Sequence, residues 1–102
     1  MLFISGQVPL DAKGQLVGSG DFSAQAEQVF RNLKAALDSE GASFRDVVKI
    51  TTYVRDMTHR DDLQKVRSKY FSSEPPASTL VGVTALANPE FMLEIEAIAI
   101  LD

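Results

Sequence analysis

Phe91–Ile100 reads F-M-L-E-I-E-A-I-A-I, and this segment decides the fold. Strand alternation divides it into two sets: Phe91, Leu93, Ile95, Ala97 and Ala99 on one face, and Met92, Glu94, Glu96, Ile98 and Ile100 on the other. Because both faces are largely apolar, the segment is predicted to lie inside a sheet and not at its exposed edge.

Two carboxylates interrupt this apolar strand. Glu94 and Glu96 share a face because they are two residues apart, and a carboxylate among apolar side chains is unfavourable without partners or solvent. The pair could flank a pocket or meet a neighbouring chain. It could equally lie at a solvated margin of the sheet or pair with lysine and arginine, so both interpretations stay open.

The segment before the closing strand contains a helix and a second strand. A helix is predicted from a cap at Asp21 or Ser23 to about Glu40, ended by Gly41, with one apolar stripe: Ala26, Val29, Phe30, Leu33 and Leu37. The β-branched residues of 47–55 predict a strand. Alternation there puts Val48, Ile50, Thr52 and Val54 on one face, and Val47, Lys49, Thr51, Tyr53 and Arg55 on the other.

Four shorter elements complete the pattern. Residues 2–5 predict a short strand, and residues 15–17 a brief second one. A second helix is expected after Thr58, which would cap it with Asp61 as the reciprocal partner, and Pro75-Pro76 would stop it. Residues 78–84 predict another strand.

This order of elements predicts an α+β fold in which two helices cover one face of a mixed sheet. The other face has no helix to cover it. Tyr53, Val47 and apolar residues of the last strand are expected on that open face. This is more apolar surface than a monomer exposes to water, so a homo-oligomer is expected.

Composition excludes several kinds of chemistry. The 102 residues suit one domain, which we take as 1–102. The chain has no cysteine and one histidine, His59, so a metal site, a thiol nucleophile or a histidine relay has few residues to use. The net charge of −4 disfavours nucleic acid as a partner. No segment resembles a membrane span or a signal peptide, and we expect a cytoplasmic protein.

Several motifs in order resemble the RidA/YjgF family, whose older descriptions are L-PSP endoribonuclease and translation inhibitor. They are S-G-Q-V-P-L-D-A-K-G at 5–14, the helix around Asn32, D-V-V-K-I-T-T-Y-V-R-D-M at 46–57, P-P-A-S-T-L-V at 75–81 and E-I-E-A-I-A at 94–99. The resemblance covers essentially the whole chain. The glycine–proline–tyrosine signature of the family's opening strand has no counterpart before residue 2.

The resemblance implies a chorismate-mutase-like homotrimer in which the sheets form an inner barrel and small molecules bind in clefts between subunits. It also implies hydrolysis of reactive enamines and imines, such as 2-aminoacrylate, to 2-oxo acids and ammonia without a metal or organic cofactor. In such a site an arginine binds the substrate carboxylate, backbone N–H groups near the Ser-Gly-Gln turn orient it, and a glutamate moves protons.

The family's site residues transfer unevenly to this chain. Gly6 matches the glycine of the turn and Glu94 the catalytic glutamate. The family's proline–alanine–arginine–serine segment reads Pro76-Ala77-Ser78-Thr79, so Ser78 stands in place of the carboxylate-binding arginine. Ser78 and Leu80 point the same way along their strand and are expected to line the cleft.

Two further positions complete the transfer. Gln64 and Arg67 occupy positions that hold asparagine and tyrosine in typical deaminases. A serine hydroxyl cannot replace a bidentate guanidinium, so a changed substrate and slow turnover of carboxylate-bearing imines are expected. Arg67 or Arg55 could supply a substitute guanidinium. The alternative is that both are ordinary surface arginines.

Three functions remain to be compared. The first is a cofactor-free imine or enamine hydrolase with an altered substrate, in which Glu94 is catalytic and Gly6, Ser78 and Leu80 bind substrate. The second is a regulatory module that binds a small metabolite without turnover. The third, RNA cleavage or inhibition of translation, is disfavoured by the negative charge and by the single histidine.

Overall fold

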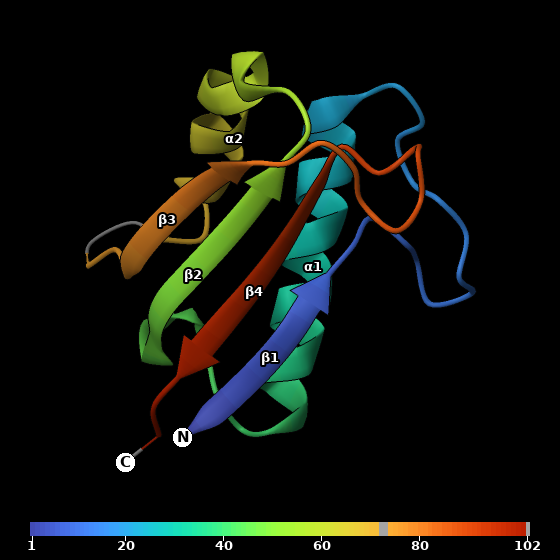
Figure 1. Ribbon diagram of the computed structural model, residues 1–102. Coiled ribbons are helices and arrows are strands. Elements are labelled where there is room, and N and C mark those ends of the chain that lie inside the picture. The colour runs from blue at the N-terminus through green and yellow to red at the C-terminus, as the bar shows by residue number, and fades with distance from the viewer. Residues whose placement is uncertain (72–73, 102) are drawn as a thin grey trace.

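The computed structural model describes residues 1–71 and 74–101 and has a mixed four-stranded sheet with two helices on one face (Figure 1). The elements are β1 (Leu2–Gln7), α1 (Phe22–Ser39), η1 (Phe44–Asp46), β2 (Val47–Val54), η2 (Met57–His59), α2 (Arg60–Arg67), β3 (Ala77–Gly82) and β4 (Leu93–Ala99). The spatial order of the strands is β1-β4-β2-β3. The predicted α+β class is therefore confirmed.

Strand β4 lies inside the sheet, as its sequence predicts. It pairs antiparallel with β1 on one side and with β2 on the other. Its four core residues Leu93, Ile95, Ala97 and Ala99 are buried against the helices. Strands β2 and β3 are parallel and are joined through α2, which places this helix over the β2–β3 half of the same face.

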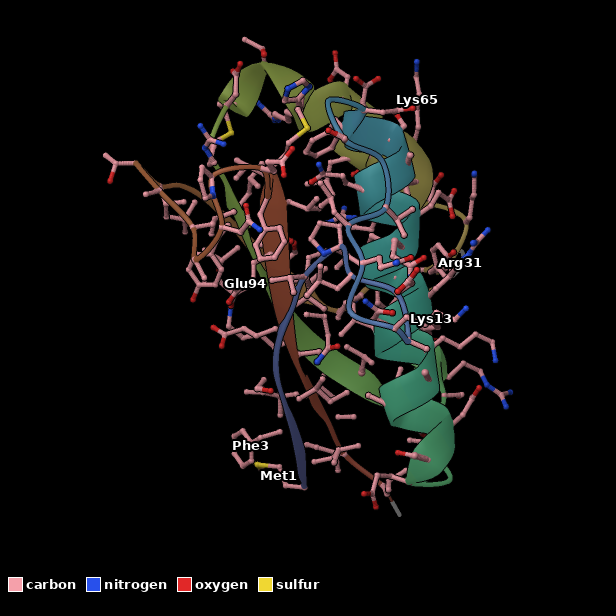
Figure 2. All side chains as sticks on the ribbon, turned by 90° about the vertical axis from the view of Figure 1, so that its right-hand side faces the viewer. Met1, Phe3, Lys13, Arg31, Lys65 and Glu94 are labelled. Atoms are coloured by element: carbon pink, nitrogen blue, oxygen red, sulfur yellow. The ribbon has the colours of Figure 1, made fainter. Side chains whose placement is uncertain are left out.

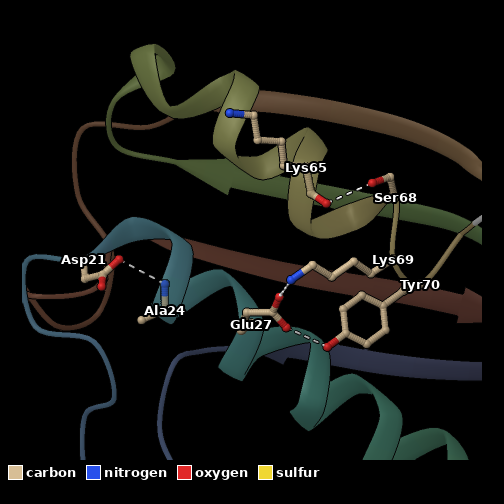
Figure 3. Close-up of polar contacts among 7 residues, drawn as sticks. All are labelled: Asp21, Ala24, Glu27, Lys65, Ser68, Lys69 and Tyr70. Carbon is tan, nitrogen blue, oxygen red and sulfur yellow. Dashed lines mark hydrogen bonds and ion pairs between the residues drawn. The ribbon is translucent and has the colours of Figure 1, made fainter.

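Helix α1 begins and ends where the sequence predicts. The side chain of Asp21 accepts a hydrogen bond from the backbone N–H of Ala24, which caps the N-terminus (Figure 3). Gly41 has a φ of +70° just beyond the helix, in the region that favours glycine. All five residues of the predicted apolar stripe are buried in the core.

The predicted faces of β2 are wrong at its first two residues. Val47 is buried in the core and Val48 is 43% exposed, although alternation predicts the reverse. The register between β2 and β4 shifts between Val47 and Lys49, which is a bulge in the ladder. A bulge inserts one unpaired residue and so reverses the alternation on one side of it. From Ile50 onward the predicted faces are correct.

Two smaller elements also differ from the prediction. Asp56, and not Thr58, is the cap: its carboxylate accepts from the N–H and the hydroxyl of Thr58 at the start of η2. Helix α2 has no side-chain cap and ends at Arg67, well before Pro75. The segment 15–17 forms a single bridge, Leu10 with Leu16, and no strand, because Asp11 folds the loop back through its side chain.

An aromatic cluster joins the end of α2 to α1. Tyr70 stacks on Phe30 with ring centroids 4.8 Å apart, and Phe44 and Phe71 pack around them. The Tyr70 hydroxyl donates to Glu27 over 2.9 Å, and Lys69 forms an ion pair with the same carboxylate (Figure 3). The segment after α2 is therefore fixed to α1 by both packing and charge.

Among the residues that the structure describes, no helix has the combination of length and apolar character that crossing a bilayer requires.

Candidate functional site

A cavity of about 480 Å³ lies between α2 and the sheet, next to the edge strand β3. Ser78 and Leu80 pair in register with Ile50 and Thr52 of β2, so all four point to the helix side of the sheet. The cavity is lined by Thr52, Arg60, Asp61, Leu63, Gln64, Arg67, Ser78 and Leu80. Four of the residues singled out from the sequence, Gln64, Arg67, Ser78 and Leu80, thus come together here.

The guanidinium of Arg67 contacts Ser78. Its Nη1 donates a hydrogen bond to Ser78 Oγ over 2.9 Å, and its side chain is half-buried. Arg55, the other arginine considered from the sequence, lies elsewhere and donates to the backbone oxygens of Pro89 and Phe91. Of the two alternatives, Arg67 brings a guanidinium to the cavity and Arg55 does not.

The end of α2 holds Arg67 in place. The Ser68 hydroxyl donates to the Lys65 carbonyl over 2.9 Å and closes the last turn (Figure 3). Lys69 and Tyr70 then attach the chain to Glu27 of α1. The ion pair with Lys69 is the main reason that the pKa of Glu27 is lowered, and the bond from Tyr70 acts in the same direction.

The second group of predicted site residues is Gly6 and Glu94. A methyl group on Gly6 would lie 2.0 Å from Glu94 Oε2, so the glutamate side chain passes directly over the Gly6 backbone. The β1–β4 register also shifts between Ile4 and Gln7, so the ladder is irregular at this contact. Asn32 of α1 fixes the following loop, donating to the carbonyls of Val8 and Leu10 over 2.8 Å each.

Glu94 and Glu96 have different surroundings although they share a face. The Tyr53 hydroxyl donates to Glu96 Oε1 over 2.7 Å, whereas no side-chain hydrogen bond or ion pair to Glu94 occurs among residues 1–71 and 74–101. The bond to Glu96 is the largest cause of a raised Tyr53 pKa, and the charge of Glu94 adds to it. Lys49 binds Thr79, not Glu96.

The two groups lie on opposite faces of the sheet. Glu94 pairs in register with Tyr53 on the open face, whereas Ser78 and Leu80 face α2. Figure 2 shows the sheet edge-on, with Glu94 and Phe3 on the side away from α1. One subunit alone therefore does not bring Glu94 and Ser78 into one cavity.

Sequence reasoning missed four residues that line the α2 cavity: Thr52, Arg60, Asp61 and Leu63. A helical signal for Arg60 was present, because 60, 64 and 67 are spaced i, i+4 and i+7 and share a face. His59 is half-buried and stacks on Phe22 with ring centroids 4.5 Å apart. No cluster of three or more metal-ligating side chains occurs within the described residues.

The comparisons with known proteins agree with this architecture. Residues 1–101 match the family described as Endoribonuclease L-PSP. A RutC family protein from Pyrococcus horikoshii is 41% identical over 96% of this chain and 77% of its own length. A 2-iminobutanoate/2-iminopropanoate deaminase from Dermatophagoides farinae is 30% identical over 99% of this chain and 78% of its own length.

A solved structure of a family member has the same fold. A Rid family protein of unknown function from Yersinia pestis superimposes with a TM-score of 0.91 at 42% identity, covering 98% of this chain and 77% of that one. The helix-backed mixed sheet, the cavity at its edge and the carboxylate on its open face define an α+β protein with a candidate small-molecule cleft. The chain belongs to the Rid/YjgF family, also described as Endoribonuclease L-PSP.

Proposed function

We propose that the protein hydrolyses reactive enamines or imines, without a cofactor, in clefts between the subunits of a homotrimer. The single observation that carries this proposal is the contact of Glu94 with Gly6. It puts a carboxylate that has no side-chain partner among the described residues directly beside the backbone of Gly6. A deaminase of this kind is among the relatives of the chain.

The chemistry needs one group that moves protons. Water adds its oxygen to the imine carbon, a proton passes to the nitrogen, and the C–N bond breaks to give a carbonyl compound and ammonia. Glu94 would take the proton from water and return it to the departing nitrogen. An enamine first accepts a proton on carbon, which the same carboxyl group could deliver.

The proposal requires a trimer, because one subunit alone does not form the complete cleft. Glu94 lies on the open face in contact with Gly6, and the cavity beside Ser78 lies on the other face, so a second subunit is needed to join them. The open face also has apolar surface for an interface: Phe3 is 69% exposed and Val81 is 38% exposed. A depression of about 340 Å³ beside Phe3 and Ile98 follows this face.

We further expect a substrate different from that of relatives with arginine at the position of Ser78. If no arginine of β3 binds the substrate carboxylate, the carboxylate binds elsewhere, and the imine carbon then lies at a different position relative to Glu94. Misplacement by about 1 Å can cost about 100-fold in rate. Small carboxylate-bearing imines should therefore be poor substrates, and Ser78→Arg should improve them.

The test is the disappearance of an imine generated in the assay by an amino-acid oxidase, compared with its spontaneous hydrolysis. Wild-type protein should accelerate the loss of at least one imine, and Glu94→Gln should remove the acceleration. Ser78→Arg should act faster than wild type on the smallest carboxylate imines. If no imine is hydrolysed faster than without protein, the hydrolase proposal is wrong.

The second candidate is a regulatory module that binds a metabolite without turnover. The presence of serine at position 78 in place of the family's arginine favours this candidate, because the cavity beside Ser78 is still formed without that arginine. Saturable binding of a 2-oxo acid with no acceleration of any imine would support this candidate. RNA cleavage remains disfavoured by the net charge of −4.

A further inference from the structure

The cavity beside β3 contains the guanidinium of Arg67, which forms no ion pair with the residues that the structure describes. Arg67 is half-buried at the end of α2, and its hydrogen bond goes to the neutral hydroxyl of Ser78 over 2.9 Å. The ion pairs within residues 1–71 and 74–101 are Lys34–Asp38 and Lys69–Glu27, and neither includes Arg67. A half-buried charge that lacks a counter-ion favours an anionic ligand.

The hydrogen bond to Ser78 prepares both groups for such a ligand. Ser78 Oγ accepts from Arg67, so its own O–H remains free to donate. The guanidinium has further N–H donors in one plane, arranged to bind two oxygens of a planar anion. The hydroxyl and the guanidinium together offer donors to one carboxylate, which neither group could bind as well alone.

The rest of the cavity limits what the anion is attached to. Leu63 and Leu80 give it apolar walls, and Thr52 and Gln64 add neutral polar groups. A volume of about 480 Å³ suits a small organic molecule. An inorganic ion would leave the leucine surface unused, so a short apolar chain with a terminal carboxylate fits better.

We propose that Arg67 is the carboxylate anchor of this cleft and that Ser78 is its positioning residue. The anchor is delivered from helix α2 and not from strand β3. This inference deepens the proposed function, because it names the group of the substrate that the same cleft recognises. The ligand class is accordingly a carboxylate on a short apolar chain. Its carboxylate binds on the α2 side of the cavity and not where an arginine at position 78 would hold it, so the smallest 2-imino acids still react slowly.

Arg60 is the alternative anchor within the same cavity. It lies about two turns before Arg67 on the same face of α2, but its side chain is exposed. Asp61, next to it in the sequence, adds a negative charge to the lining of the cavity. An exposed guanidinium is screened by water and gives weak selectivity. Arg67 is the better anchor because it is less exposed and is held by Ser78.

Binding of a substrate-product analogue to the full-length protein tests this without any turnover. The probes are 2-oxobutanoate and its uncharged relative 2-oxobutanamide, titrated by calorimetry at constant ionic strength. Wild-type protein should bind the acid about 10- to 100-fold more tightly than the amide, the effect expected of a charge-assisted hydrogen-bonded pair. Arg67→Met should remove this preference and leave the affinity for the amide unchanged.

Matched variants distinguish a specific effect of Arg67 from the effect of losing any positive charge. Lys65→Met removes one positive charge from an exposed position of the same helix, and Arg60→Met removes one from the same cavity. Both should keep the preference for the acid. Ser78→Ala should weaken binding of the acid several-fold and not that of the amide, and Ser78→Thr, which keeps the hydroxyl, should restore it.

Several results would overturn the assignment. They are equal binding of acid and amide by wild type, an unchanged preference in Arg67→Met, or a preference lost in Arg60→Met instead. If Arg67→Met fails to fold, loss of acid binding in Ser78→Ala with rescue by Ser78→Thr decides the matter. Selective acid binding through Arg67 without imine hydrolysis would retain this inference and reject the hydrolase.

Discussion

Glu94 and Gly6 are in such close contact that a methyl group on the glycine would lie 2.0 Å from the carboxylate oxygen Oε2. The Glu94 side chain thus lies directly against the backbone of Gly6. Glycine at position 6 is explained by this approach. The proposed role of Glu94 depends on this contact, and substitutions at either residue test it.

Gly6→Ala should impair turnover without unfolding the protein. The added methyl group displaces the Glu94 side chain, and the imine-hydrolysis rate should fall about 100-fold. The side chain can move toward solvent, so the free energy of unfolding should change by no more than about 1 kcal/mol. Gly82→Ala is the control, because its methyl group would meet Met57 at an ordinary 3.7 Å. Equal rates for the two variants would contradict this view of Gly6.

Glu94→Gln and Glu96→Gln are a matched pair that separates the catalytic carboxylate from its neighbour. Glu94→Gln should reduce the rate at least about 100-fold, the range expected for loss of general acid–base catalysis. Glu96→Gln should keep most of the rate. It should also lower the raised pKa of Tyr53, because the hydrogen bond to Glu96 is the main cause of that shift. Ultraviolet titration of tyrosine measures the pKa. Equal losses of rate in both variants would show that Glu94 has no special role.

Phe3→Glu should prevent assembly. Phe3 is 69% exposed on the open face, and a charge buried at an interface without a partner is strongly unfavourable. Light scattering should find a trimer for wild type at micromolar concentration and a monomer for Phe3→Glu. Ala35→Glu, which adds the same charge at an exposed position of α1, should remain a trimer. A monomeric wild type would remove the basis for a site between subunits.

Glu27→Gln should reduce stability in a pH-dependent way. The folded-state pKa of Glu27 is lowered, chiefly by Lys69, so its stabilisation is present above the ordinary value of 4.5 and is lost as the pH falls through the lowered pKa. The variant should unfold more easily by about 1 kcal/mol at pH 7, and the difference from wild type should shrink below pH 4.5. Urea unfolding at several pH values measures this. Asp38→Asn, which breaks an exposed ion pair, should have a smaller effect.

The sequence predicted those parts of the fold that depend on regular periodicity. The central position of β4, the stripe of α1 and the glycine after it are confirmed, because each follows from repeated burial on one face. The reversed faces of Val47 and Val48 could not be predicted, since a bulge leaves no mark in the alternation of apolar residues. Asp56 as the cap was missed because a short 3₁₀ turn precedes α2.

The candidate site was only partly predictable. Its residues came from a family resemblance, and alternation correctly placed Ser78 and Leu80 on one face. Alternation within a strand does not say which face a residue takes relative to another strand, so the separation of Ser78 from Glu94 required the register of the sheet. The contact of Arg67 with Ser78 depends on side-chain geometry between α2 and β3, which the sequence does not encode as a pattern.

In the proposed trimer, Glu94 of one subunit and Arg67 of the next form one site. The most direct test coexpresses Glu94→Gln and Arg67→Met chains with different tags and isolates the mixed trimers by two successive affinity steps. Each mixed trimer then has one cleft with both native residues, so it should regain about one third of the wild-type imine-hydrolysis rate, although each parent variant is inactive. No recovery in mixed trimers, with wild type active under the same conditions, would contradict the claim.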